Sequence, residues 1–262
     1  HEVRGVPLTE AVAICPADPY VASDYFRAVT DLLTEVEREG AAPLLLMGIE
    51  PTYPSEKYGY ILPETGDTQS KVASFREKPD EATAKKYIDE GALWNSGIFA
   101  FRLGYVLDKM QEIFPFDGYE DLYNRYEELP KISFDYAVAE KEENIAVRRY
   151  SGTWLDIGTW NTLTGVMPED TIGRVTLDET CSNVHAVNTA SMPILCMGLK
   201  NVVVAASPEG ILIADKHRSS MMKPYVEKLH TPVMYTEKSW GEFHILDADT
   251  NSLTIKITLS PG

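Results

Sequence analysis

The chain has 262 residues, of which 44% are hydrophobic and 24% charged, the composition of a globular protein with an ordinary core. Its formal net charge of −16 argues against nucleic acid or an anionic membrane as a partner. No apolar run is long enough to span a membrane and the opening residues show no signal peptide, so we expect a cytoplasmic protein.

The first part of the chain predicts an α/β alternation. Residues 11–15 are a continuous apolar run, typical of a buried parallel strand, and Asp18 follows at its carboxyl end. Asp24 is predicted to cap a helix that stops near Gly40, and residues 43–48 form a second buried strand. This strand–helix–strand order predicts a doubly wound, Rossmann-like sheet.

The next elements continue this pattern. Two strands over 58–62 and 71–76 flank a glycine-containing turn and predict a hairpin. Asp80 is predicted to cap a helix that ends at Gly91. A strand over 93–102, helices over 106–113 and 119–129, and a strand over 144–150 follow.

Beyond Gly165 the pattern changes to short β-like segments broken by turn residues, followed by one short helix and a tail with strand character. We therefore predict an α/β domain over residues 1–165, a β-rich domain over 166–232, and a tail over 233–262. The three cysteines, Cys15, Cys181 and Cys196, have no metal-ligand spacing and are predicted to be reduced thiols, with Cys15 in a buried strand.

Two aspartates are candidate metal ligands. Asp18 lies at a strand end, where open α/β sheets bind their ligands, and Asp156 stands in a turn rich in tryptophan and glycine. Mg²⁺ binds few protein carboxylates and keeps positions for phosphate oxygens and water, so one Mg²⁺ could bridge the pair. The alternative reading of either residue alone is an ordinary turn or cap aspartate.

Four further residues could bind a phosphorylated sugar. Lys78 precedes Pro79, which predicts an extended backbone and a side chain that can neutralise a phosphate. Glu77 and Asn95 could bind vicinal hydroxyls, and Gly59 would allow a ligand to approach the backbone. The alternatives are a solvated surface lysine, cap or ladder contacts, and a hairpin glycine.

Asp135 could either cap the next helix or face the candidate site, and capping is favoured. Trp154 is predicted to be a core anchor, and His185 an ordinary residue of the β-rich domain.

Seven segments occur in the order seen in mannose-1-phosphate guanylyltransferases, and together they make the chain resemble that family over nearly its whole length. They are Pro16-Ala17-Asp18, Gly48-Ile49-Glu50-Pro51-Thr52, Tyr58-Gly59-Tyr60-Ile61, Glu77-Lys78-Pro79, Trp94-Asn95-Ser96-Gly97-Ile98-Phe99, Ser133-Phe134-Asp135-Tyr136 and Trp154-Leu155-Asp156-Ile157-Gly158.

The resemblance implies that GTP and mannose 1-phosphate are converted to GDP-mannose and pyrophosphate. It implies that Asp18 and Asp156 hold Mg²⁺ and act in catalysis with Lys78, which contacts the sugar phosphate. It also implies that Gly59, Glu77 and Asn95 bind the hexose. The implied fold is a nucleotidyltransferase domain followed by a left-handed β-helix-like region, and a homodimer is left open.

The chain departs from the family at its ends and within two motifs. No glycine-rich, arginine-containing triphosphate loop precedes Asp18, Pro19 stands where histidine is frequent, and Lys57 stands where glycine is usual. Residues 239–262 resemble the entry to the cupin domain of bifunctional phosphomannose isomerase/guanylyltransferases. We expect a fragment that binds mannose 1-phosphate weakly and does not turn over GTP by itself.

Two alternatives to this function remain. One is another sugar-1-phosphate nucleotidyltransferase, for example one that transfers a thymidylyl or uridylyl group to glucose 1-phosphate. The other is a non-catalytic module that binds a sugar phosphate and lacks the triphosphate loop.

Overall fold

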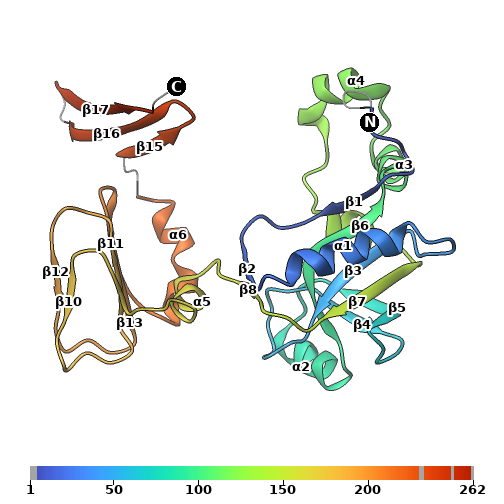
Figure 1. Cartoon of the computed structure of the whole chain (residues 1–262), viewed down its shortest axis with the longest axis horizontal. Helices are drawn as coiled ribbons and strands as arrows, with labels where there is room; N and C mark the ends of the chain where they lie inside the picture. Colours follow the sequence, from blue (N-terminus) through green and yellow to red (C-terminus); the bar gives the residue numbers. More distant parts are fainter. Residues whose placement is uncertain (1–4, 230–232, 249–250, 261–262) are drawn as a thin grey trace. The chain divides into compact units, whose positions relative to one another are not determined.

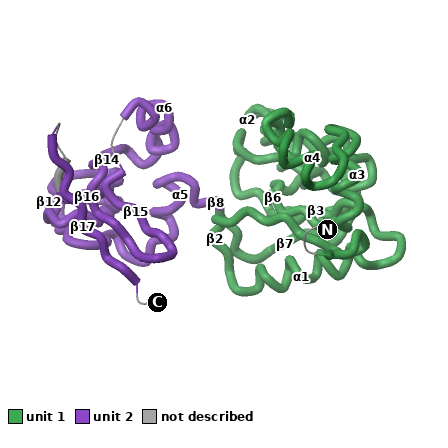
Figure 2. Tube along the Cα trace, turned by 90° about the horizontal axis from the view of Figure 1, so that it is seen from above, with its two compact units in different colours: residues 1–155 green, residues 156–262 purple. Residues whose placement is uncertain are grey.

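The computed structural model describes residues 5–229, 233–248 and 251–260 (Figure 1). The chain divides into two compact units after Leu155, coloured separately in Figure 2. The domain boundary expected after residue 165 stays a prediction. In the described ranges, no helix combines the length and the apolar character needed to cross a bilayer.

The first unit is built on a six-stranded mixed sheet with the order β1-β6-β3-β7-β5-β4. Among the described pairings of this sheet, only β3 and β7 are parallel, and every pairing of β6 is antiparallel. The mixed α/β architecture agrees with the predicted fold class. The strands are β1 (Ala11–Ile14), β3 (Leu44–Ile49), β4 (Tyr60–Pro63), β5 (Gln69–Arg76), β6 (Leu93–Arg102) and β7 (Ile145–Tyr150).

Strand β1 corrects one prediction. It lies at the edge of the sheet and pairs antiparallel with β6, and Ile14 and Cys15 are exposed. The predictions of a buried parallel strand and a core thiol at Cys15 are therefore wrong. Strands β1 and β3 do run in the same direction, because both are antiparallel to β6, but β6 lies between them. An apolar run indicates a strand without revealing how many neighbours it has.

The sheet has a core on each face, because successive side chains of a strand point to opposite sides. Leu45 and Met47 of β3 pack in a cluster with Leu32 of helix α1 (Tyr25–Val36). Leu44 and Leu46 pack in a second cluster with the π-helical turn η2 (Asp135–Ala139). All six residues of β3 are buried, as expected for a strand between two neighbours.

Of the two predicted helix caps, one makes the expected hydrogen bond and the other does not. Asp80 caps α2 (Glu81–Asp89) as predicted, since its carboxylate accepts from Thr83 N at 2.8 Å. Asp24 occupies the N-cap position of α1 but makes no side-chain cap bond. It accepts instead from the hydroxyl of Tyr150 at 2.9 Å, which links the start of α1 to the end of β7.

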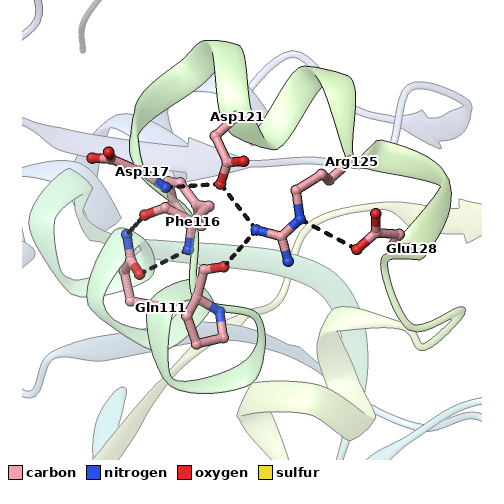
Figure 3. A network of polar contacts seen from close by, with 7 residues as sticks. Gln111, Phe116, Asp117, Asp121, Arg125 and Glu128 are labelled. Carbon is pink, nitrogen blue, oxygen red and sulfur yellow. Dashed lines mark hydrogen bonds and ion pairs between the residues drawn. The ribbon is translucent and has the colours of Figure 1, made fainter.

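Polar contacts bridge the connection between α3 (Leu103–Ile113) and α4 (Gly118–Asn124) (Figure 3). Neither helix contains a buried residue. The Gln111 amide donates to Phe116 O at 2.7 Å and accepts from Phe116 N at 3.2 Å. Arg125 bridges Asp121 and Glu128, at 3.0 and 3.2 Å. The short 3₁₀ turn η1 (Tyr126–Glu128) follows α4.

Short parallel strands build much of the second unit. β10 (Val175–Leu177) pairs with β12 (Ile194–Cys196), and β11 (His185–Asn188) pairs with β9 (Thr171–Ile172) and β13 (Val202–Ser207). Partner residues are 15 positions apart between β9 and β11, 18 between β11 and β13, and 19 between β10 and β12, as in Thr171 opposite Ala186, His185 opposite Val203 and Val175 opposite Ile194. Such stacking of consecutive strands indicates a β-helix-like coil, whose left-handedness stays a prediction.

The remaining elements of this unit are antiparallel strands and short helices. They are α5 (Trp160–Thr164), β14 (Gly210–Asp215), η3 (Arg218–Met221), α6 (Lys223–Val226), β15 (Tyr235–Lys238), β16 (Gly241–Ala248) and β17 (Leu253–Leu259).

A buried lysine contacts the parallel strands of this unit. Lys216 is 4% exposed, and its ammonium contacts Asn183 Oδ1 at 2.6 Å and His185 Nδ1 at 2.7 Å. Because a protonated lysine only donates, His185 Nδ1 must accept, and the neutral ring carries its proton on Nε2, 3.5 Å from Asp170. Burial and the Lys216 charge lower the pKa of His185, although Asp170 opposes them. The prediction of an ordinary His185 missed this contact.

This arrangement predicts a loss of stability in the second unit at low pH. The unfolded His185 has a pKa of about 6.5 and binds a proton more readily than the folded one. The free energy of unfolding should therefore fall as the pH drops from the unfolded pKa towards the lowered folded pKa. Hydrogen exchange of the β11 and β13 amides between pH 5 and pH 8 measures this. The substitution His185→Gln should flatten the dependence and His217→Gln, at an exposed position, should not. Equal slopes in all three proteins would contradict the assignment.

Candidate functional site

Three of the predicted sugar-binding residues meet although they come from separate segments. Gly59 precedes β4, Glu77 follows β5 and Asn95 lies in β6. The backbone N–H of Asn95 donates to Gly59 O at 2.8 Å. A Cβ at Gly59 would lie 2.3 Å from Glu77 Oε2 and 3.2 Å from Asn95 Cβ. Gly59 is therefore closely packed, because the Glu77 carboxylate lies in the space that a side chain would enter.

Glu77 is a buried carboxylate with one partner. Its side chain is 6% exposed, and Oε1 accepts from Lys78 Nζ at 2.8 Å. The other oxygen, Oε2, is buried without a hydrogen-bond partner in the described structure. Burial raises the pKa of Glu77, and the nearby Asp135 and Glu140 add to the rise, whereas Lys78 opposes it. The site therefore holds an acceptor that is poorly satisfied by the protein.

Lys78 lies in the left-handed region with a φ of 46°, so the prediction of an extended backbone before Pro79 is wrong. In an extended chain, neighbouring side chains point to opposite sides, whereas here the Lys78 ammonium reaches Glu77. Its side chain is 53% exposed, so it remains accessible to an anion from solvent. The hydrogen bond to Glu77 is the largest cause of a raised pKa for Lys78, which keeps it protonated.

The Asn95 side chain is held at both ends of its amide. It is 8% exposed, its Nδ2 donates to Asp135 Oδ1 at 2.7 Å, and its Oδ1 accepts from Gly97 N at 3.1 Å. The favoured capping role of Asp135 is wrong, because η2 has no side-chain cap bond. The motif Ser133-Phe134-Asp135-Tyr136 marked this residue in the sequence, but no local pattern reveals a contact across 40 positions.

The two candidate metal ligands adjoin a separate two-stranded sheet of β2 (Pro19–Val21) and β8 (Trp154–Asp156). Asp18 immediately precedes β2 and is exposed, whereas Asp156 is the last residue of β8. Asp156 Oδ1 accepts from Gly158 N at 2.8 Å. In the described part of the chain, no three His, Cys, Asp or Glu side chains form a metal-binding group. That Asp18 and Asp156 share a metal ion stays a prediction.

Arg149, which no sequence motif marked, pairs with Glu50. It lies on β7 opposite Gly48 of the parallel strand β3, and Glu50 comes just after that strand. The Arg149 Nε is buried without a hydrogen-bond partner in the described structure. Only the register of β3 against β7 could have indicated this pair. Trp154, in contrast, is buried in the core as predicted, with its ring 6.1 Å from that of Tyr58.

The close packing at Gly59 gives a direct test. The substitution Gly59→Ala places a methyl group against Glu77 Oε2, so we expect it to lower the free energy of unfolding by about 1–3 kcal/mol. Chemical denaturation measures the change. Gly66→Ala is the matched control, since nothing lies within 4 Å of a Cβ there. Equal stability of the two variants would contradict the packing described here.

Comparison with known proteins agrees with these motifs. The family described as "Nucleotidyl transferase" matches residues 7–172. The alginate biosynthesis protein AlgA of Pseudomonas aeruginosa is 30% identical over 97% of this chain and 59% of its own length. The mannose-1-phosphate guanylyltransferase ManC of Salmonella typhimurium is 31% identical over 85% of this chain and 53% of its own length.

A solved structure shares the fold. The crystal structure described as mannose-1-phosphate geranyltransferase from Thermus thermophilus has a TM-score of 0.69 and 27% identity, over 84% of this chain and 69% of that one. The chain thus spans less than two thirds of the length of the curated relatives above. Since the family match extends over more than half of its residues, the chain belongs to the nucleotidyl transferase family.

Proposed function

We propose that the protein transfers GMP from GTP to mannose 1-phosphate, giving GDP-mannose and pyrophosphate. The observation that carries this proposal is the meeting of Gly59, Glu77, Lys78 and Asn95, which combines hydroxyl-binding groups with one accessible cation. Relatives named mannose-1-phosphate guanylyltransferase, which match most of the chain, support the same substrate pair.

The ion pair of Glu77 and Lys78 suits a ligand that carries both hydroxyls and a phosphate. Lys78 Nζ donates to Oε1 of Glu77 at 2.8 Å. A sugar phosphate offers Lys78 a more highly charged partner, and Oε1 is then available to accept from a hexose hydroxyl. Asn95 keeps a second N–H and a second oxygen lone pair for another hydroxyl. The phosphate and the hydroxyls of one ligand would thus replace contacts that the protein makes with itself.

The reaction needs no covalent enzyme intermediate. An oxygen of the sugar phosphate attacks the α-phosphorus of GTP, a new P–O bond forms, and the bond to the β-phosphate breaks, so that pyrophosphate leaves with the electron pair. Charge on the phosphates is the main obstacle, and positioning and electrostatic stabilisation lower the barrier. Lys78 would neutralise the sugar phosphate and orient its oxygen.

Nucleotidyltransferases of this family generally use a divalent metal. Asp18 and Asp156 supply carboxylate oxygens, the hard ligand type that Mg²⁺ prefers. Asp18 and Asp156 would hold the ion, which supplies charge neutralisation at the phosphates when bound. We place the protein in the cytoplasm, where GTP is available and free thiols such as Cys15, Cys181 and Cys196 persist.

Lys78 provides the sharpest test of the sugar-phosphate contact. Lys78→Ala should raise the KM for mannose 1-phosphate by roughly 10- to 100-fold, because it removes a charged hydrogen bond to the phosphate. The KM for GTP should change little. Lys71→Ala is the matched control, since Lys71 is an exposed lysine of β5, the strand that leads to Glu77. An unchanged KM for mannose 1-phosphate in Lys78→Ala would contradict the assignment of Lys78 to the sugar phosphate.

Asp156 tests the metal assignment and the reaction together. Pyrophosphate release by the complete gene product should require GTP, mannose 1-phosphate and Mg²⁺. Asp156→Asn should abolish turnover and keep the calorimetric affinity for mannose 1-phosphate, because the substitution removes a charge without changing shape. Turnover by this variant would contradict the assignment of Asp156. Faster turnover with glucose 1-phosphate and either UTP or dTTP would contradict the proposed substrates.

A further inference from the structure

Among the described contacts, Asp135 is the one carboxylate that binds the amide of Asn95. It begins η2, which is anchored on β6 by Phe134, whose ring centroid lies 4.7 Å from that of Phe99 and 5.8 Å from that of Phe101. The buried residues at the end of the same turn pack in one core cluster with side chains of β3 and β6. The turn therefore holds Asp135 in place against the strand that carries Asn95.

The contact determines which way the Asn95 amide faces. An ionised carboxylate only accepts hydrogen bonds, so it binds the Nδ2 end of the amide and repels the Oδ1 end. Gly97 N donates to the Oδ1 end, and Gly97 has a φ of 73°, a conformation that few other residues adopt. The two contacts leave one N–H and one oxygen lone pair of Asn95 in defined directions for a ligand.

Asp135 also lies in a cluster of charges around the site. The groups that act on Glu77 are Lys78 beside it, Asp135 on η2, and Glu140 immediately after η2. Tyr136 acts with Asp135 on Lys78. Glu140 contacts an arginine of β5 at 3.8 Å and has no hydrogen bond to Asn95 among the described contacts. Asp135 thus differs from Glu140 in having both a charge effect and a direct contact with a predicted sugar-binding side chain.

We propose that Asp135 is a positioning residue that orients the Asn95 amide for the sugar hydroxyls. The inference rests on the proposed function for the identity of the ligand, and on the contact of Asp135 with Asn95 for the role. Asp135 acts through Asn95 and does not itself contact the substrate. It selects between two orientations of Asn95, of which one presents the wrong donor and acceptor to the ligand.

The experiment compares Asp135→Ala, Asp135→Asn and Glu140→Gln in the complete gene product. Asp135→Ala leaves the buried Nδ2 without its acceptor, so the KM for the sugar 1-phosphate should rise roughly tenfold or more while the KM for the nucleotide stays unchanged. Asp135→Asn retains an acceptor oxygen and should recover part of the affinity. Glu140→Gln removes a nearby charge and should leave the KM for the sugar unchanged.

A pH profile tests the charge effect of Asp135 on Glu77. Asp135 raises the pKa of Glu77, so removal of its charge should lower that pKa and move the acid limb of kcat/KM to lower pH in Asp135→Asn. Glu140→Gln should shift the limb in the same direction. An unchanged sugar KM and an unchanged acid limb in a folded Asp135→Ala protein would overturn the proposal.

A readout without substrate keeps this test independent of the proposed function. The side-chain amide of Asn95 should give two distinct proton resonances in ¹⁵N spectra, and both should move in Asp135→Ala while remaining in place in Glu140→Gln. Unchanged resonances in Asp135→Ala would overturn the role of Asp135 whatever the ligand. If the wild-type protein used another sugar 1-phosphate, only the proposed substrate would fail, and the KM comparison would be made with that sugar.

Discussion

The candidate site depends on one buried carboxylate, that of Glu77. Removal of an ionised carboxylate from water is costly unless hydrogen bonds and an opposite charge compensate for it. Here the protein supplies Lys78 to one oxygen and, within the described structure, leaves the other without a donor. With a left-handed backbone at Lys78, the lysine ammonium contacts this carboxylate, and the absence of a side chain at Gly59 leaves space for it. A ligand whose phosphate binds Lys78 would leave Oε1 of Glu77 available to a ligand hydroxyl.

The scaffold explains why these groups can stay close together. Strand β6 lies between β1 and β3, and eight of its ten residues are buried, so Asn95 is carried by a strand with a core on each face. The η2 turn packs on one of these faces and presents Asp135. Positions held by packed strands vary less than positions on loops, which is what orientation of a substrate requires.

The extent to which sequence predicts this structure differs between local and long-range features. Strand β6 has the predicted bounds, and Asp80 caps α2 as predicted. Both features depend on residues that are close together in the sequence. The neighbour of β1 and the partner of Asp24 were not predictable, since both are decided by residues more than eighty positions away. Lys78 shows a different limit, because a local rule failed there: the following proline predicts an extended backbone. Lys78 instead adopts the left-handed conformation, in which its ammonium contacts Glu77. A proline disfavours other backbone conformations of the preceding residue but does not forbid them.

The charge distribution around the site accounts for how an acidic protein could bind an anionic sugar phosphate. Glu77, Asp135 and Glu140 act together on the charge near Lys78, which pairs with Glu77, while the exposed Arg76 pairs with Glu140. At physiological ionic strength, charges on the distant surface are screened over about 8 Å, so the net charge of −16 matters less than these neighbours. Local carboxylates keep Lys78 protonated and hold it near the hydroxyl-binding groups. The same carboxylates oppose a second anion, and the divalent cation proposed at Asp18 and Asp156 would offset that repulsion.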